Sequence, residues 1–551
     1  MSRGSMTTLI SIALPLLFLV VFVLYPVASV IFDGVLNGPG RSFVEVLTSP
    51  VTHRTLVFTV SQAALSTAAA VLLGLPAAFL LTRIRFRGRG VVRAALLVPF
   101  VLPPIVVVVG FIRMFGPQGI LDSIAMTIVG TRTSVLNLSS GLTGIVLAHV
   151  LYNIPLVALM VSASLDRLSA EIEETAEILG ASTVQRLVRI VLPHIRTALV
   201  SSALLVFLFC FMSFPIVLAL GQGEYMTIEV QMWKAFRTFD YRETSSLALM
   251  QLCVTLALAY AYHLSRRGMG QVTRTLSPRT RSISELSRSE RVAATAYLSF
   301  ILVVTSGPVL SVIHSSVYDP LVGEYTSRGF TNLLSPGLGG GLTPLLNSLL
   351  YSSLATILSV TIALVLATSH RGPQRAPHSV ESLLTLLPLG VSSITLAYGL
   401  LRAIAVPLML SYSPWPLIVI AQTVIGLPFT TRAIETAASS LDQDYLDQAD
   451  ILGASRLNRL FLVEIPLMAP GIVVGAAFAF AMAIGEMSAT LFIAMPQNTT
   501  LAVAIYQYLG VRKFVEAGAC ALVIVVACFV AFILMDRLVS GRAGGVLGWS
   551  E

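Results

Sequence analysis

Two segments of this chain repeat one another: EETAEILGASTVQRLVRIVLP, from Glu173 to Pro193, and LDQADILGASRLNRLFLVEIP, from Leu446 to Pro466. An offset of 273 positions aligns Gly180 with Gly453 and the two closing prolines with each other. The same register, extended without gaps, aligns Thr227 with Thr500. Because the repeat continues beyond one polar segment into apolar sequence, the chain is predicted to be a duplicated unit, each copy about half its length.

Composition places the chain among membrane proteins. Of its 551 residues, 56% are hydrophobic and only 11% are charged, with a mean hydropathy of +0.86. The net charge of +8 does not indicate a nucleic-acid partner, because the arginines lie between apolar runs rather than on one soluble face. The four cysteines all lie in apolar segments and indicate no disulfide framework.

Apolar runs long enough to span a bilayer number twelve, six in each half. They cover 8–31, 55–81, 92–115, 142–164, 198–220, 244–264, 292–315, 346–369, 380–405, 414–436, 468–494 and 516–537. The first run resembles a signal peptide in position, but it exceeds the apolar length of such peptides and is interpreted as a retained helix. The fold class is therefore predicted as an all-α membrane protein of about 12 transmembrane helices.

Basic residues set the predicted orientation. They gather in the loop after the second run and in the link between the halves, at Arg83, Arg85, Arg87, Arg89, Arg93, Arg266, Arg267, Arg274, Arg279, Arg281, Arg288 and Arg291. Both regions, and both termini, are expected in the cytosol. An even number of spans in each half makes the repeats parallel. The expected domains are 1–270 (core 52–265) and 291–551 (core 345–537), joined by a solvated cytosolic linker, 271–290.

The first repeated segment is predicted to form two short helices separated by a break. Ser169 is placed to cap the first helix, and Gly180 tolerates the positive φ that ends it. Ser182 and Gln185 have the spacing of a capping box for the second helix, and Pro193 marks entry into the next span.

The second segment is predicted to build the same shape with different residues. Ser440 and Gln443 are assigned as its capping box, Gly453 as its break and Ser455 as the new cap. The alternative is a pair of amphipathic helices lying on the membrane surface. A surface anchor does not require one Gly-to-Pro spacing in both copies, which favours a shared mechanical role.

This pattern resembles the EAA loop of permease subunits of type I ABC importers. In the first copy the matching residues are Glu174, Ala176, Gly180, Ile190, Leu192 and Pro193, with Thr175 as a departure; in the second they are Asp447, Ala449, Gly453, Val463, Ile465 and Pro466. The resemblance implies coupling to an ATPase through Glu174, Ala176, Gly180, Ala181, Pro193, Asp447, Ala449, Gly453, Ala454 and Pro466.

The resemblance further implies two parallel repeats of the MetI-like permease fold in a prokaryotic inner membrane. Its expected partners are a cytosolic ABC ATPase homodimer, an extracytoplasmic solute-binding protein and the lipid bilayer, with no nucleic acid. The fused arrangement looks like the ferric-iron and thiamine branch, most like the thiamine type. The main alternative function is a secondary transporter with two six-helix halves; a channel or scaffold is a third class.

No catalytic or metal site is expected. A phosphate-binding P-loop requires Gly-Lys-Ser/Thr, and neither Lys234 nor Lys513 follows a glycine. The chain is therefore predicted to be no enzyme and to carry no cofactor of its own, with ATP bound by partner subunits. The scattered histidines have no metal-ligand spacing.

A few residues at membrane depth are candidates for the solute path. Glu486 is the most conspicuous, and its repeat mate is Ser213. Either Glu486 lines the path or it is a structural acid hydrogen-bonded between helices. Pro155 and Pro428 are a matched pair of potential kinks. His149 is expected to bond between helices rather than to bind a ligand.

Overall fold

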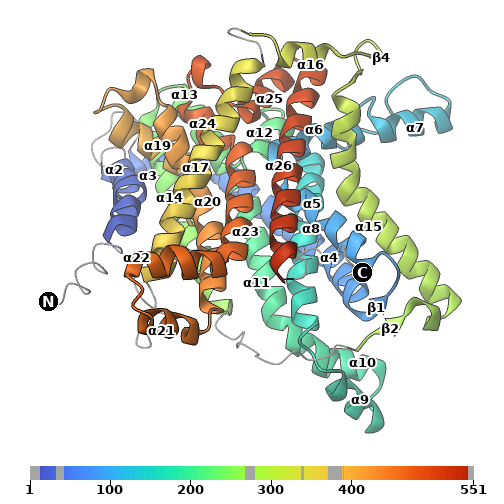
Figure 1. Ribbon diagram of the computed structural model, residues 1–551. Coiled ribbons are helices and arrows are strands. Elements are labelled where there is room, and N and C mark those ends of the chain that lie inside the picture. The colour runs from blue at the N-terminus through green and yellow to red at the C-terminus, as the bar shows by residue number, and fades with distance from the viewer. Residues whose placement is uncertain are drawn as a thin grey trace.

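The computed structural model describes residues 13–32, 42–266, 279–336, 341–369, 388 and 390–543. Long helices run side by side through the molecule, and short helices cover its two ends (Figure 1). Eleven helices in these ranges are long and apolar enough to cross a membrane. These helices confirm the predicted all-α membrane protein. Helices suit a membrane because they satisfy their own backbone hydrogen bonds where no water is present.

The described residues of the first half contain six candidate membrane spans, and some of these consist of consecutive shorter helices. Its elements are η1 (Val20–Leu24), α2 (Tyr25–Ser29), α3 (Phe43–Thr48), α4 (Pro50–Arg83), β1 (Ile84–Arg85), α5 (Arg89–Val101), α6 (Pro104–Phe115), α7 (Ile120–Val129), α8 (Gly141–Leu165), α9 (Ala170–Ile178), α10 (Thr183–Arg186), η3 (Leu187–Val191), α11 (Leu192–Phe211), α12 (Pro215–Leu220), α13 (Ile228–Arg237) and α14 (Tyr241–Arg266).

The second half repeats this order. Its elements are β2 (Arg281–Ser282), η4 (Ile283–Glu285), α15 (Arg288–Ser315), β3 (Tyr318–Asp319), β4 (Glu324–Tyr325), α16 (Arg328–Leu333), α17 (Leu342–Ser369), α19 (Ser393–Leu400), η5 (Leu401–Ala405), η6 (Leu410–Tyr412), α20 (Trp415–Ser439), α21 (Gln443–Ile451), α22 (Arg456–Arg459), η7 (Leu460–Glu464), α23 (Ile465–Ile484), α24 (Ser488–Ile493), η8 (Pro496–Asn498), α25 (Leu501–Gly510) and α26 (Phe514–Ala543).

The predicted count of twelve spans is not confirmed. Residues 380–387 and 389 of the predicted run 380–405 lie outside the described residues, and the described remainder forms only a short apolar helix, Ser393–Ala405. The predicted run 92–115 is divided between α5 and α6, because Leu102 and Pro103 leave the helical conformation. Proline cannot donate a helical hydrogen bond, so a break is expected at this point.

The first helix of each half packs against the other half. Helix α15 of the second half packs along α5 and α6, and α2 of the first half packs against α19 and η5. The contacts are close: a Cβ on Gly110 would lie 1.8 Å from the carbonyl oxygen of Pro308, and one on Gly399 would lie 2.9 Å from the carbonyl oxygen of Pro26. The glycines therefore let the helices approach backbone to backbone.

The described part of the linker is docked rather than merely solvated. Strand β2 pairs in parallel with β1, which follows the second span. The guanidinium of Arg83 donates to the carbonyl oxygen of Arg279, at 3.2 Å. The linker is thus held to the loop after the second span.

The fifth span of each half is interrupted at matched positions. Helix α11 ends at Phe211 and α12 starts at Pro215, while α23 ends at Ile484 and α24 starts at Ser488. The segments after these interrupted spans contain α13 and α25, whose bounds differ by the repeat offset. Neither helix was predicted, because α13 carries mixed charge and α25 is too short to count as a span.

Candidate coupling loops and the interface between the halves

The first repeated segment forms the predicted helix, break and helix. The Ser169 hydroxyl accepts from the N–H of Glu171 at 3.2 Å, and so caps α9. Gly180 ends that helix at a φ of +86°. The N–H of Ala181 then donates to the carbonyl oxygen of Ala176 at 2.9 Å, which closes the left-handed turn. Ser182 and Gln185 form the predicted capping box of α10.

The second segment has the same shape but a different first cap. The carboxylate of Asp442 accepts from the N–H of Asp444 and caps α21. The predicted capping box of Ser440 and Gln443 was wrong, since the Ser440 hydroxyl donates to the carbonyl oxygen of Ala437 instead. Asp442 lies two residues closer to the helix and offers a stronger acceptor.

The break of the second segment repeats that of the first. Gly453 has a φ of +78°. The N–H of Ala454 donates to the carbonyl oxygen of Ala449 at 3.0 Å, and Ser455 caps α22 as predicted. The alanines of the motif therefore form the hydrogen bond that closes each turn. No atom lies within 4 Å of a Cβ added to either glycine, so φ alone calls for glycine there.

Each second short helix runs directly into a spanning helix. Helices α10, η3 and α11 form one continuous run, Thr183–Phe211, and α22, η7 and α23 form another, Arg456–Ile484. Pro193 and Pro466 lie inside these runs, shortly after the π-helical turns η3 and η7, where the regular hydrogen-bond ladder is already altered. Each repeated segment is therefore joined to its spanning helix without a break in helical structure.

Both segments expose matched apolar side chains. Ile178 is 85% exposed and its mate Ile451 is 84% exposed, while Leu179 and Leu452 are 81% and 86% exposed. Three further matched pairs are also exposed: Ile172 with Tyr445, Val184 with Leu457, and Val188 with Phe461. Figure 1 shows α9 and α21 at the same end of the molecule, on opposite sides. Such paired apolar patches are typical of surfaces that bind another protein.

An arginine and an acid brace each segment across its break. Arg186 pairs with Glu177, and Arg459 pairs with Asp450 at the same spacing. Arg279 of the linker also contacts Glu177, at 2.6 Å. Hydrogen bonds from the guanidinium groups of Arg279 and Arg186 lower the pKa of the Glu177 carboxyl below its ordinary value.

The remaining predicted coupling residues lie at the surface of these segments, with one exception. Glu174, Asp447, Pro193 and Pro466 are exposed, whereas Ala449 is buried. An acid that the motif comparison passed over, Glu173, is buried and pairs with Arg83 after the second span. Its mate is Leu446, which is also buried.

The interrupted fifth span of the second half is capped by Glu486. Its carboxylate accepts from the N–H of Ala489 at 2.7 Å and from the N–H and hydroxyl of Thr490 at 2.9 and 2.7 Å. These contacts cap α24 within one segment, where an anion is favoured at a helix N-terminus, and they are not the bonds between helices that the structural alternative described. A role in the path stays a prediction. A Cβ on the preceding Gly485 would lie 1.8 Å from Cγ of Pro103, so this break touches the other half.

In the first half, the position that matches Glu486 is Ser213, which lies among other uncharged hydrogen-bonding side chains. The hydroxyl of Ser213 lies 2.7 Å from Nε2 of His149, whose Nδ1 lies 3.5 Å from the hydroxyl of Ser66. His149 therefore bonds between helices, as predicted. Pro155 and Pro428 lie inside the uninterrupted helices α8 and α20.

A cluster of one acidic side chain and several aromatic rings lies at the contact between the halves, and it was not predicted from the sequence. Glu229, Trp233 and Phe236 lie on one face of α13, at i, i+4 and i+7. The ring of Phe236 stacks on that of Phe492 in the second half at 4.7 Å, and the ring of Trp233 lies 5.0 Å from it. The helical spacing of Glu229, Trp233 and Phe236 was the available signal, but these residues lie beyond the predicted run that ends at 220.

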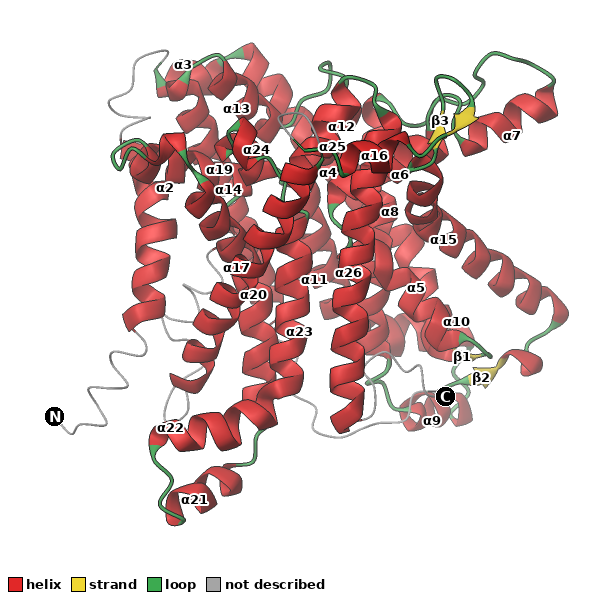
Figure 2. Ribbon diagram, turned by 45° about the horizontal axis from the view of Figure 1, so that its top comes forward, coloured by secondary structure: helices red, strands yellow, loops and turns green. Residues whose placement is uncertain are grey.

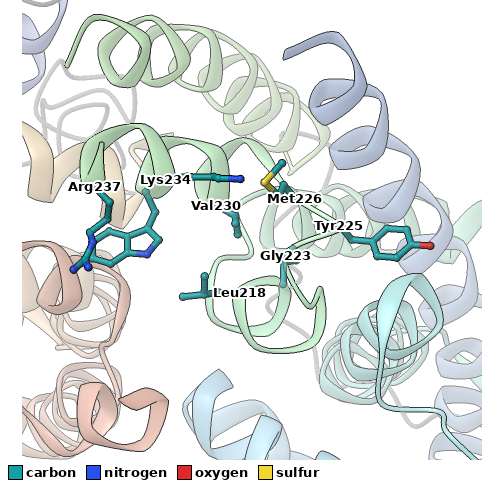
Figure 3. Close-up of a pocket in the computed structure, with 9 residues that line it drawn as sticks. Leu218, Gly223, Tyr225, Met226, Val230, Lys234 and Arg237 are labelled. Atoms are coloured by element: carbon teal, nitrogen blue, oxygen red, sulfur yellow. The ribbon is translucent and has the colours of Figure 1, made fainter. Parts of the chain in front are cut away.

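A pocket of about 240 Å³ opens beside this cluster and is lined in part by Trp233. Lys234 and Arg237 project from this helix, and Gly223 and Tyr225 come from the segment before it (Figure 3). The Arg237 guanidinium lies 5.5 Å from the centre of the Trp233 ring. In Figures 1 and 2, α13, α24 and α25 lie at the end opposite to α9 and α21. The pocket is therefore basic and distant from the repeated segments.

Comparison with known proteins identifies relatives over most of the chain. The family described as "Binding-protein-dependent transport system inner membrane component" matches residues 70–273 and 356–543. The thiamine transport system permease protein ThiP of Brucella suis is 26% identical over 498 residues, covering 88% of this chain and 87% of the relative.

Two further relatives span a similar share. ThiP of Escherichia coli K12 is 26% identical over 517 residues, covering 91% of this chain and 92% of its own. The putative ferric transport system permease protein FbpB 1 of Haemophilus influenzae is 24% identical over 502 residues, covering 89% and 78%.

Proposed function

This chain belongs to the family of binding-protein-dependent transport system inner membrane components, and from that premise we propose that it is the single-chain permease of an ATP-driven thiamine importer. Two permease domains, 1–270 and 291–551, enclose the solute path between them. The chain binds no nucleotide itself; partner ATPase subunits hydrolyse ATP.

The observation that carries this proposal is the matched exposure of Ile178 with Ile451 and of Leu179 with Leu452. Exposing four large apolar side chains to water is unfavourable unless a partner covers them. Two equivalent patches suit a partner with two equivalent grooves, as an ATPase homodimer has. Each patch then acts as one coupling site.

The arginine-rich loop supports a cytosolic location for these patches. Arg83 of that loop pairs with Glu173 of the first segment, so the two belong to the same side of the membrane. An excess of arginine in short loops favours the cytosol. The pocket beside Lys234 and Arg237 then faces the extracytoplasmic side, where its charge suits acidic side chains of a solute-binding protein.

The continuous helices supply the lever for alternating access. When the ATPase subunits close on ATP, the two patches approach each other, and α11 and α23 carry the movement to the interrupted fifth spans. ATP and the loaded binding protein shift the conformational equilibrium only through their different affinities for its two states.

Thiamine is favoured as the substrate over ferric iron. The thiamine permeases match this chain at 26% identity and the ferric permease at 24%, and the former align over more of their own length. No group of three or more His, Cys, Asp or Glu side chains within the described ranges is arranged to hold a metal ion.

The test is uptake of radiolabelled thiamine into proteoliposomes that contain this permease, its ATPase and its binding protein. We expect uptake that requires ATP and both partners and that an ionophore does not abolish. Uptake driven by a proton or sodium gradient, without the ATPase, would instead establish a secondary transporter. Uptake of ferric iron alone would refute the substrate.

A further inference from the structure

We propose that Glu229, together with Glu486 and Gln251, forms a binding site for a flat organic cation in transit between the halves. This inference rests on the proposed function and names the group within the permease that recognises the charge of the substrate.

The first observation is a buried carboxyl group on each side of one contact between the halves. Glu229 is 2% exposed and Glu486 is 7% exposed. The contact joins Phe236, on the helix of Glu229, to Phe492, on the helix that Glu486 caps, with ring centres 4.7 Å apart. Neither acid forms an ion pair with any Lys, Arg or His in the described part of the chain. Buried charge needs a compensating charge, and a proton or a cation can provide it.

The second observation is an amide with spare hydrogen-bonding capacity at the same place. Gln251 is 1% exposed, and its Nε2 donates to Oε1 of Glu229 at 2.7 Å. The carbonyl oxygen of that amide is buried and has no hydrogen-bond partner. Since leaving such an acceptor unsatisfied costs free energy, this side chain is suited to a donor that arrives with a ligand.

The third observation is the aromatic surface beside the acids. Trp233 and Phe236 follow Glu229 on the same face of α13, and Phe492 follows Glu486 in α24. Faces of aromatic rings attract cations, and rings stack on other flat rings. The rings give the cluster flat apolar faces, which suit an organic ring better than a hydrated metal ion.

The two acids have different tasks. The carboxylate of Glu486 is fixed by the N-terminus of α24. Glu229 lies in the first half and accepts a hydrogen bond from Gln251 of the same half. Its helix α13 contacts the second half through the rings of Trp233 and Phe236, which pack on Phe492. A movement of the halves therefore changes the surroundings of Glu229 and can release a cation held there.

The decisive variant is Glu229→Gln, because glutamine keeps an acceptor for Gln251 and removes only the charge. We expect ATP-dependent thiamine uptake to fall about tenfold or more, in line with loss of a desolvated charge contact. Glu229→Asp should restore most of the uptake. Glu486→Gln should also lower uptake, while binding of the ATPase to the permease stays unchanged. Glu516→Gln is the matched control, a buried acid that pairs with Arg328 away from the rings.

A second readout separates recognition of charge from folding. An uncharged thiamine analogue with a neutral five-membered ring should inhibit binding of labelled thiamine to the Glu229→Gln permease–ATPase complex as well as thiamine itself does, but should not inhibit binding to wild type. Wild-type thiamine uptake by Glu229→Gln would overturn the site and leave the importer function standing. Absence of thiamine uptake by the unaltered protein would overturn both.

Discussion

The two coupling loops have one shape and two kinds of anchorage. Both break at a glycine with positive φ, and both are braced by an arginine and an acid across the break. The first loop is anchored to other parts of the chain, because Glu173 pairs with Arg83 and Glu177 with Arg279 of the linker. The second loop is anchored within its own segment, since Arg459 also pairs with Glu464 at 3.1 Å. The duplicated unit has thus kept its geometry and its exposed tip while its attachments diverged.

The largest expected effect tests whether the exposed tips of the two loops, Ile178–Leu179 and Ile451–Leu452, contribute equally to binding of the ATPase. Leu179→Asp and Leu452→Asp should each weaken binding of the ATPase to the solubilised permease by about tenfold or more, as for central interface residues. Their exposures of 81% and 86% predict similar losses and little change in permease stability. The affinity is measured by titrating the ATPase over the permease immobilised on a surface.

Ile128→Asp is the matched control for the tips. This residue of α7 is 80% exposed at the opposite end of the molecule, so it should leave the affinity for the ATPase unchanged. Equal weakening by all three variants would show that the tips are not a specific docking surface.

The next effect tests the shared break. Gly180→Val and Gly453→Val should each force a β-branched residue into the left-handed region, at a cost of at least about 1–2 kcal/mol. We expect ATP hydrolysis to continue while thiamine transported per ATP falls, with normal membrane levels. Gly510→Val controls for the added side chain, since open space surrounds that glycine too. Transport per ATP at the wild-type level in both loop variants would remove the coupling role.

A smaller effect should reveal the different anchorage. Arg459→Ala removes two ion pairs, to Asp450 and to Glu464, and Glu464 is only 5% exposed. Arg186→Ala removes one pair and leaves Glu177 still paired with Arg279. Loss of an ion pair at a buried acid is the more costly change. Hydrogen exchange should therefore accelerate more in α21 and α22 of the first variant than in α9 and α10 of the second. The reverse order would contradict the assignment of anchors.

The smallest effect is a pH dependence of the first loop. The pKa of Glu177 is lowered by Arg279 and Arg186, so the stabilisation from its ion pairs is fully present above the ordinary value of 4.5 and is lost as the pH falls through the lowered pKa. Hydrogen exchange at 279–291 should accelerate in that acidic range. Glu177→Gln should show fast exchange of 279–291 already at neutral pH. Unchanged protection in this variant would show that the ion pair of Glu177 with Arg279 does not hold the linker.

Local patterns in the sequence predicted much of the first loop and less of the second. Ser169, Ser182 and both glycines act as expected because capping depends on neighbours within four residues. Asp442 was missed because two candidate caps lay close together, and only the position where the helix starts selects one of them. The run 380–405 was read as a span from composition, which does not say where a helix begins.

By itself, the sequence determined the membrane class, the duplication, the two loops and their glycine breaks, because hydropathy, repetition and capping are properties of contiguous residues. Only the tertiary structure decided that α15 and α2 cross to the opposite half, that α13 and α25 are buried helices, and that Phe236 stacks on Phe492. Those residues are far apart along the chain, and their proximity follows from how the two halves pack, which no short stretch of sequence encodes.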